Sequence, residues 1–253
     1  MGAALLVCAV SVGGLLVDGG PATAVEGGQP AILQLGDSYA SGEGGGWRGN
    51  SNNSSGNRSG TDMAAYYENG KWRYDPHRVY DKSVMGRGLD SWADDCHVAL
   101  DAPISRLKTA IPGEYIALSN IACSGAHNKH LWMQHDGGEQ QKPSRVNQLY
   151  YARAQVGPPQ DVKLVVIGAG GNDAGFGGVL RACLTAWAKK HVAPIAYPSK
   201  EKSCFKHVWD NYVYQVRNMP YNLDKTISLL RRELADKGQP ANSYRIVLTG
   251  YPM

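Results

Sequence analysis

The sequence predicts an α/β fold, a three-layer α/β/α sandwich in which helices cover both faces of a central, mostly parallel sheet. Two observations predict this class. Short apolar segments that suit buried strands alternate with segments of helical periodicity. The length of 253 residues also suits one α/β domain with a substantial core and does not require two.

The predicted strands are short, apolar and closely followed by turn residues. The first ends in Gly-Asp-Ser, and the third, VKLVVI, runs into a glycine-rich turn. The four strands are Ala31 to Gly36, Tyr115 to Ile121, Val162 to Ile167 and Tyr244 to Leu248.

Helices are predicted between these strands. Residues from Trp92 to about Ala110 suit a helix if Pro103 lies at a kink or near a helix start. Further helices are expected at Ser144 to Gln155 and at Asn222 to Lys237, where Gly238 is a C-terminal stop. The Gly-, Ser- and Asn-rich stretch 42–60 should be a surface loop, and stretch 66–80 suggests no regular structure.

Three turns follow predicted strands: Gly36-Asp37-Ser38, Cys123-Ser124-Gly125 and Gly170-Gly171-Asn172-Asp173. In a parallel sheet wound with helices, functional groups gather at the carboxyl ends of the strands. We therefore expect the three turns to meet on one rim.

Ser38 is the candidate nucleophile, because a strand-to-helix turn exposes a hydroxyl and brings helix amide groups near it. The alternative is that Ser38 only caps the helix, which serine often does. Taken alone, Ser38 favours this second interpretation.

The three turns together resemble the three sequence blocks of the SGNH (GDSL-like) hydrolases, in the same order. Gly36 to Gly42 (GDSYASG) looks like the first block, Ala122 to Ala126 (ACSGA) like the second, and Gly170 to Asp173 (GGND) like the third. The resemblance covers most of the chain from Ala31 and is strongest to secreted, disulfide-containing actinobacterial-type members. It implies a flavodoxin-like SGNH domain over 25–253 that hydrolyses carboxylic esters through an acyl-serine.

The resemblance also implies roles for single residues. Ser38 would be the nucleophile and give its backbone N–H to the oxyanion hole, together with the backbone N–H of Gly125 and the side-chain amide of Asn172. Such donors suit a tetrahedral intermediate with a full negative charge. The alternatives are a plain turn glycine at 125 and an asparagine satisfied by its own backbone at 172. No cofactor and no metal are implied.

The catalytic base is the missing part of the resemblance. The family's late Asp-x-x-His block does not occur after Asn172, and the late His207 has Asp210 on the wrong side. His97 is expected to be structural, and His127, His130 and His135 could face the rim but suit surface or packing roles better. We therefore expect the base to lie beyond Met253 and the domain to be incomplete at its C-terminus.

Other functional classes fit the sequence less well. The formal charge of +4 comes from scattered basic residues, which argues against a nucleic-acid partner. A dinucleotide-binding G-x-G-x-x-G fails at Asp173, no phosphate loop occurs, and Ala40 breaks the G-x-S-x-G elbow of α/β-hydrolases.

The N-terminal segment 1–24 suggests a signal peptide that ends in Ala22-Thr23-Ala24, so we expect a secreted protein without a stable membrane span. Four cysteines remain after cleavage, which in an exported protein favours disulfides over a metal site. Three pairings are possible, and the simplest joins Cys96 to Cys123 and Cys183 to Cys204.

We expect a monomer that acts on a small-molecule, lipid or carbohydrate ester. The alternative function is a catalytically silent SGNH-fold module that binds carbohydrate or a partner surface through the loop aromatics Trp47, Trp72 and Tyr74. The sequence carries no pattern that identifies the substrate.

Overall fold

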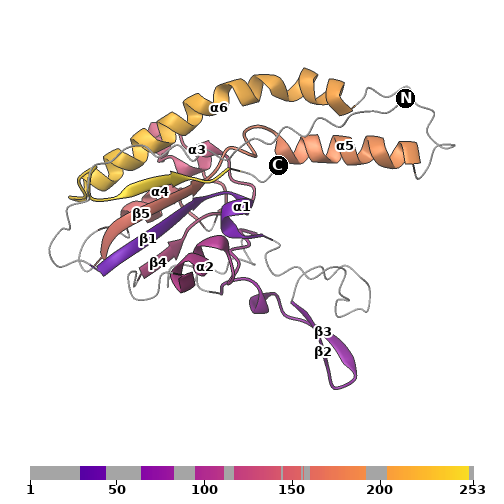
Figure 1. Cartoon of the computed structure of the whole chain (residues 1–253), viewed down its shortest axis with the longest axis horizontal. Coiled ribbons are helices and arrows are strands. Elements are labelled where there is room, and N and C mark those ends of the chain that lie inside the picture. The colour runs from indigo at the N-terminus through magenta and orange to yellow at the C-terminus, as the bar shows by residue number, and fades with distance from the viewer. Residues whose placement is uncertain are drawn as a thin grey trace.

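The computed structural model describes residues 29–43, 64–82, 95–110, 117–143, 145–154, 156, 160–191 and 204–250. The predicted signal peptide, most of the predicted loop 42–60 and Trp47 lie outside the described residues. Within the described part, a four-stranded sheet forms the centre and a small two-stranded hairpin projects from it (Figure 1).

All pairings in the main sheet are parallel, in the spatial order β4-β1-β5-β6. In chain order this is 2-1-3-4, as in the first four strands of a doubly wound flavodoxin-like sheet. The four predicted strands are confirmed as β1 (Gln29–Gly36), β4 (Ala117–Asn120), β5 (Gln160–Gly168) and β6 (Arg245–Leu248).

Both faces of the sheet are covered, which confirms the three-layer architecture. On one face, alternate strand residues such as Leu33 and Ile167 pack against Leu131, Leu149 and Leu230. These come from α3 (Asn128–Leu131), α4 (Gln148–Ala154) and α6 (Cys204–Ala235). On the other face, Ile32 and Val166 pack against Ile104 of α2 (Pro103–Ala110) and against Val79 and Tyr80.

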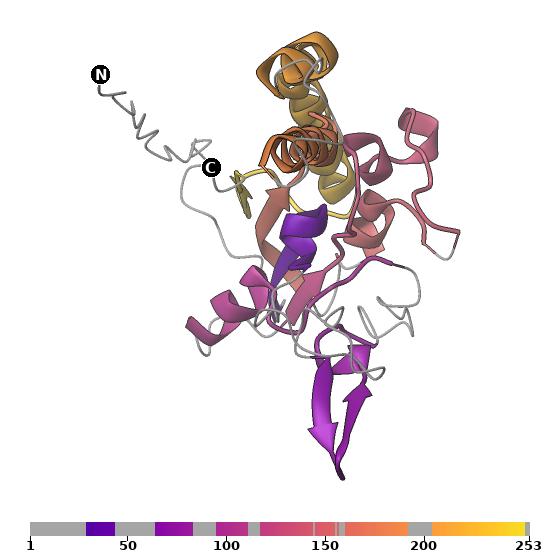
Figure 2. The ribbon, with the colours of Figure 1, turned by 90° about the vertical axis from the view of Figure 1, so that its right-hand side faces the viewer.

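The long helix α6 has two different parts. Beyond Pro220, the buried side chains Thr226, Leu230 and Leu234 hold it against the sheet, and it ends near Gly238 as predicted. The described side chains before Pro220 are exposed or half-buried. This first part runs beside α5 (Phe176–His191), and together they form an arm that projects past the sheet (Figures 1 and 2). No described helix is both long and apolar enough to span a bilayer.

Two regions differ from the sequence prediction. In the stretch 92–110, the described helix begins only at Pro103, because proline fits a first turn but not a helix interior. The stretch 66–80 is not irregular, since β2 (Ala65–Glu68) and β3 (Lys71–Tyr74) pair as a hairpin. The Asn69-Gly70 turn, with both φ angles positive, is the signal that predicts such a hairpin.

The carboxyl ends of β1 and β5 meet at two glycines. A Cβ on Gly36, whose φ is +137°, would lie 2.0 Å from the carbonyl oxygen of Gly168, so only glycine fits there. The buried side chain of Gln148 then closes around Gly36, accepting from its N–H at 2.8 Å and donating to its carbonyl at 2.8 Å. The end of β1 is thereby fixed by both β5 and α4.

We predict that Gln148→Leu lowers the free energy of unfolding by about 1–3 kcal/mol, because it leaves a buried backbone N–H without its acceptor. Urea denaturation measures the change. Gln134→Leu, at an exposed position of the short 3-10 helix η2 (Gln134–Asp136), is the matched control and should change stability by less than about 0.5 kcal/mol. Equal losses in the two variants would contradict the role of Gln148.

Candidate active site

Ser38 is the first residue of the one-turn helix α1 (Ser38–Ser41), directly after β1 and Asp37. The helix cap is Asp37, whose carboxylate accepts from the Tyr39 N–H at 3.1 Å. The interpretation of Ser38 as the cap is therefore wrong. The hydroxyl of Ser38 makes no hydrogen bond within the described residues and stays available.

The backbone around Ser38 is tightly held, although α1 has only four residues. The Ser38 carbonyl accepts from the N–H groups of Gly42 at 3.1 Å and Glu43 at 3.0 Å and from Ser41 Oγ at 3.1 Å. A single turn has little macrodipole, so the support we expected from it for an oxyanion is small. Any such support has to come from individual donors.

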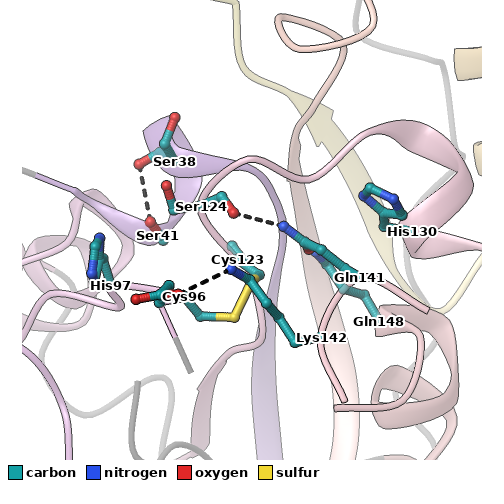
Figure 3. Close-up of a disulfide and its surroundings, with 12 residues drawn as sticks. Ser38, Ser41, Cys96, His97, Cys123, Ser124, His130, Gln141, Lys142 and Gln148 are labelled. Carbon is teal, nitrogen blue, oxygen red and sulfur yellow. Dashed lines mark hydrogen bonds and ion pairs between the residues drawn. A yellow bond between two sulfur atoms is a disulfide. The ribbon is translucent and has the colours of Figure 1, made fainter. Parts of the chain in front are cut away.

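The second turn, Cys123-Ser124-Gly125, lies against the first. The Cys123 N–H donates to the Gly36 carbonyl at 3.0 Å, and the Ser124 N–H donates to the Cys96 carbonyl at 3.0 Å. The predicted disulfide between Cys96 and Cys123 is confirmed (Figure 3). Gly125 is exposed with φ of +77°.

A carboxylate connects this turn to α1. Glu43 accepts from Ser124 Oγ with one oxygen and contacts His97 Nδ1 at 2.9 Å with the other. The hydrogen bond from His97 lowers the pKa of Glu43, and that from Ser124 adds to the effect. His97 also stacks on Tyr80 with ring centroids 4.9 Å apart, as expected of a structural histidine.

The third turn reaches the second through Asn172. The Asn172 Nδ2 donates to the Ala126 carbonyl at 3.0 Å, so the amide is satisfied by the second turn and not by its own backbone. The next residue, Asp173, accepts from the Asn128 N–H at 2.9 Å and ties the turn to α3. The three turns therefore lie on one rim, as the sequence predicts.

The rim offers donors to a negatively charged oxygen. Within the described residues, the backbone N–H groups of Ser38 and Gly125 make no hydrogen bond. An asparagine amide has two donor hydrogens, and Asn172 uses one of them on Ala126. Two backbone donors and one side-chain donor are thus left on the turns that carry the Ser38 hydroxyl.

None of the described histidines hydrogen-bonds to Ser38. His130 accepts from the His127 N–H at 3.0 Å and is drawn well apart from Ser38, beyond Gln141 (Figure 3). Burial, with the charge of His127, lowers the pKa of His130 to about 4, so it is a weak base at neutral pH.

His127 and His135 have their described contacts away from Ser38. His127 Nδ1 lies 4.0 Å from Asp173. His135 lines a groove of about 490 Å³ that is not lined by Ser38, Gly125 or Asn172. The side chain of His207 lies outside the described residues.

Asp37 is a buried carboxyl beside the candidate nucleophile. Burial, with the charge of Asp173 as a further cause, raises the pKa of Asp37 to about 7. The sequence does not indicate that this carboxyl is unusual, because its burial depends on how the ends of β1 and β5 pack together. It would take up a proton near neutral pH.

One group of metal-type ligands lies elsewhere, at His135, Asp136 and Glu233. Its carboxylates are already paired with cations: Asp136 with Arg232, and Glu233 with Arg232 at 2.8 Å and Arg153 at 2.7 Å. These contacts join η2 and α4 to α6, which is a structural function. Cys183 also takes part in a disulfide, whereas the side chain of its predicted partner Cys204 lies outside the described residues.

No family model and no curated protein matches the chain. Solved structures resemble it, among them two from Streptomyces. One is a phospholipase A1 from Streptomyces albidoflavus NA297, with 19% identity and a TM-score of 0.44 over 89% of this chain and 60% of that one. The other is an extracellular lipase from Streptomyces rimosus, with 19% identity and a TM-score of 0.46 over 88% of this chain and 60% of that one. The chain thus spans about 60% of the length of each, and this likeness does not decide its function.

We predict that Asp37→Asn changes the pH dependence of stability. The folded state holds a proton on Asp37 up to about pH 7, whereas the unfolded chain releases it near pH 4, so stability falls as the pH rises between these values. Asparagine does not titrate and keeps an acceptor for the Tyr39 N–H. The free energy of unfolding of the variant should therefore gain roughly 2–3 kcal/mol on the wild type between pH 5 and pH 8.

Urea denaturation at the two pH values measures this difference. Asp75→Asn is the matched control, because Asp75 caps the short 3-10 helix η1 (Pro76–Arg78) by accepting from the His77 N–H. A difference between Asp37→Asn and wild type that stays constant from pH 5 to pH 8 would contradict the raised pKa.

Proposed function

We propose that the chain is a secreted serine hydrolase of carboxylic esters, with Ser38 as the nucleophile. The observation that carries the proposal is that Asp37, and not Ser38, caps the helix in the first turn. Among the described residues, the Ser38 hydroxyl and the backbone N–H groups of Ser38 and Gly125 make no hydrogen bond, on the rim where the Asn172 amide also lies. If Ser38 served only to stabilise the turn, we would expect its hydroxyl to hydrogen-bond to a neighbouring group.

The proposed reaction has two halves. Ser38 Oγ bonds to the ester carbonyl carbon while its proton passes to a general base, and the carbonyl oxygen becomes an oxyanion held by Ser38 N–H, Gly125 N–H and Asn172 Nδ2. The intermediate then releases the alcohol, which takes the proton, and leaves an acyl-serine. Water attacks the acyl-serine along the same route and returns the free hydroxyl and a carboxylic acid.

Secretion is supported by the disulfide chemistry. Disulfides persist in oxidising compartments and are rare in the cytosol. The Cys96–Cys123 bridge joins the 95–97 loop to the second turn of the rim, so the candidate site is held in part by a bond that such an environment preserves.

A catalytically silent binding module is the second candidate, favoured by the lack of a described histidine on Ser38. The loop aromatics through which such a module would bind carbohydrate or a partner surface have less support in the structure. Trp72 and Tyr74 belong to β3 rather than to a loop, and Tyr74 is half-buried against the core. Trp47 and the side chain of Trp72 lie outside the described residues.

We predict that, in a full-length protein that supplies the general base, Ser38→Ala removes the hydrolysis of p-nitrophenyl esters, with a loss of more than about 100-fold, while the far-UV circular dichroism stays unchanged. Ser228→Ala, at an exposed position of α6, is the matched control and should retain full activity. Ser38→Ala activity within a few-fold of wild type would refute the nucleophile.

We also predict that the 253-residue chain hydrolyses esters only slowly. No described histidine hydrogen-bonds to Ser38, and a positioned base accelerates such steps by about 10²–10⁴-fold. Asn172→Ala should lower the residual rate by a further ~10²-fold, since it removes an oxyanion donor. Assays of the His127→Ala, His130→Ala and His135→Ala variants complete the test. Fast hydrolysis that one of these substitutions abolishes would identify that histidine as the base and contradict the prediction.

A further inference from the structure

Helix α5 carries an exposed row of large apolar side chains, which we call the α5 stripe: Phe176, Leu180, Leu184 and Trp187. Each of these side chains is 47–58% exposed. At 3.6 residues per turn they fall within about 80° of the helix circumference. The face that is half-buried instead carries small residues such as Ala182 and Ala186, and α5 packs against α6.

The stripe begins at the candidate active site. Phe176 follows the Gly170–Asp173 turn by three residues, and its N–H donates to the Gly171 carbonyl at 2.9 Å. From there α5 runs outward along the arm, past the edge of the sheet (Figures 1 and 2). A surface that contacts the stripe would thus also lie next to Asn172.

The charge of α5 favours a particular kind of surface. The helix has three cationic residues, Arg181, Lys189 and Lys190, and no aspartate or glutamate. An exposed apolar face with Phe, Leu and Trp, combined with the exposed Arg181 and a helix sequence of net positive charge, resembles helices that lie in the interface of an anionic lipid layer.

We propose that α5 docks the protein on the surface of a lipid aggregate with anionic headgroups, with the α5 stripe in the outer acyl layer. The inference rests on the proposed function in naming lipid esters as the substrate presented at the rim. The arm is a convex helical surface, which suits a flat, deformable lipid layer. Contiguous exposed apolar side chains of this size mark an interaction surface rather than ordinary surface residues.

The test is co-sedimentation of the purified chain with vesicles of pure phosphatidylcholine and of equimolar phosphatidylcholine and phosphatidylglycerol. The double variant Leu184→Ser/Trp187→Ser should bind the anionic vesicles at least about tenfold more weakly than wild type. The matched control Leu100→Ser/Tyr67→Ser removes side chains that are 53% and 63% exposed but lie outside the arm, and it should bind as wild type does.

Two further variants separate the contributions. Arg181→Gln should weaken binding to anionic vesicles by about fivefold and leave the weak binding to pure phosphatidylcholine unchanged. Ser38→Ala should bind with wild-type affinity, so that docking is judged independently of catalysis. In a second measurement, phosphatidylcholine with brominated acyl chains, mixed with phosphatidylglycerol, should quench tryptophan emission in wild type and less in Trp187→Phe.

Three results would overturn the proposal: no vesicle binding by wild type, equal binding by the stripe variant and its control, or undiminished quenching in Trp187→Phe. If the stripe instead joins two copies of the chain, light scattering will show a dimer that Leu184→Ser/Trp187→Ser dissociates, and vesicles will not bind. That result also overturns the proposal.

Discussion

The close approach of the paired strands β1 and β5 at Gly36 and Gly168 is the contact on which the rest of the rim depends. The absence of a side chain at position 36 lets the two strand ends touch, and the Asp37 N–H then donates to the Gly168 carbonyl at 2.9 Å. Gln148 satisfies the remaining polar groups of Gly36 from inside the core. The direction in which the chain leaves β1, and hence the position of Ser38, is set by these contacts.

Hydrogen bonds hold the other two turns beside this strand end. The Cys123 N–H donates to the Gly36 carbonyl, Glu43 joins α1 to Ser124, and Asn172 joins the third turn to the second. Within the described residues, the backbone N–H groups of Ser38 and Gly125 make no hydrogen bond, and they lie on the two turns that Glu43 holds together.

The close approach of the two strand ends also has an electrostatic consequence. It buries the carboxyl of Asp37 in the neighbourhood of Asp173, and the two negative charges disfavour each other. Protonation of Asp37 relieves both the burial cost and the repulsion. Asp173 is itself tied to α3 by the Asn128 N–H, which donates to it at 2.9 Å.

Much of the architecture could be predicted from sequence because it follows from local patterns. The four strands have short apolar runs that end in glycine or polar turns, and the place of three of these turns directly after parallel strands predicts their meeting at one edge. The Cys96–Cys123 bridge belongs to one of the three complete pairings that four cysteines allow, and the fold selects it by bringing the 95–97 loop beside the second turn.

Other features depend on contacts between distant residues and could not be predicted in that way. The roles of Gln148 and Glu43 and the raised pKa of Asp37 arise only when loops more than thirty residues apart pack together. Helix α5 was not predicted because its outward face is apolar, which obscures the usual contrast between a buried and a polar face.

Covalent labelling with a fluorophosphonate, followed by peptide mapping, tests most directly whether this rim activates Ser38. The serine oxygen attacks phosphorus and displaces fluoride as its proton passes to a base, and the negative charge that develops on the phosphoryl oxygen is stabilised by the oxyanion donors. The account predicts a single adduct, on Ser38, whose formation slows when Asn172 is replaced by alanine. An adduct on Ser41 or Ser124 instead, or labelling of Ser38 that Asn172→Ala leaves unchanged, would contradict it.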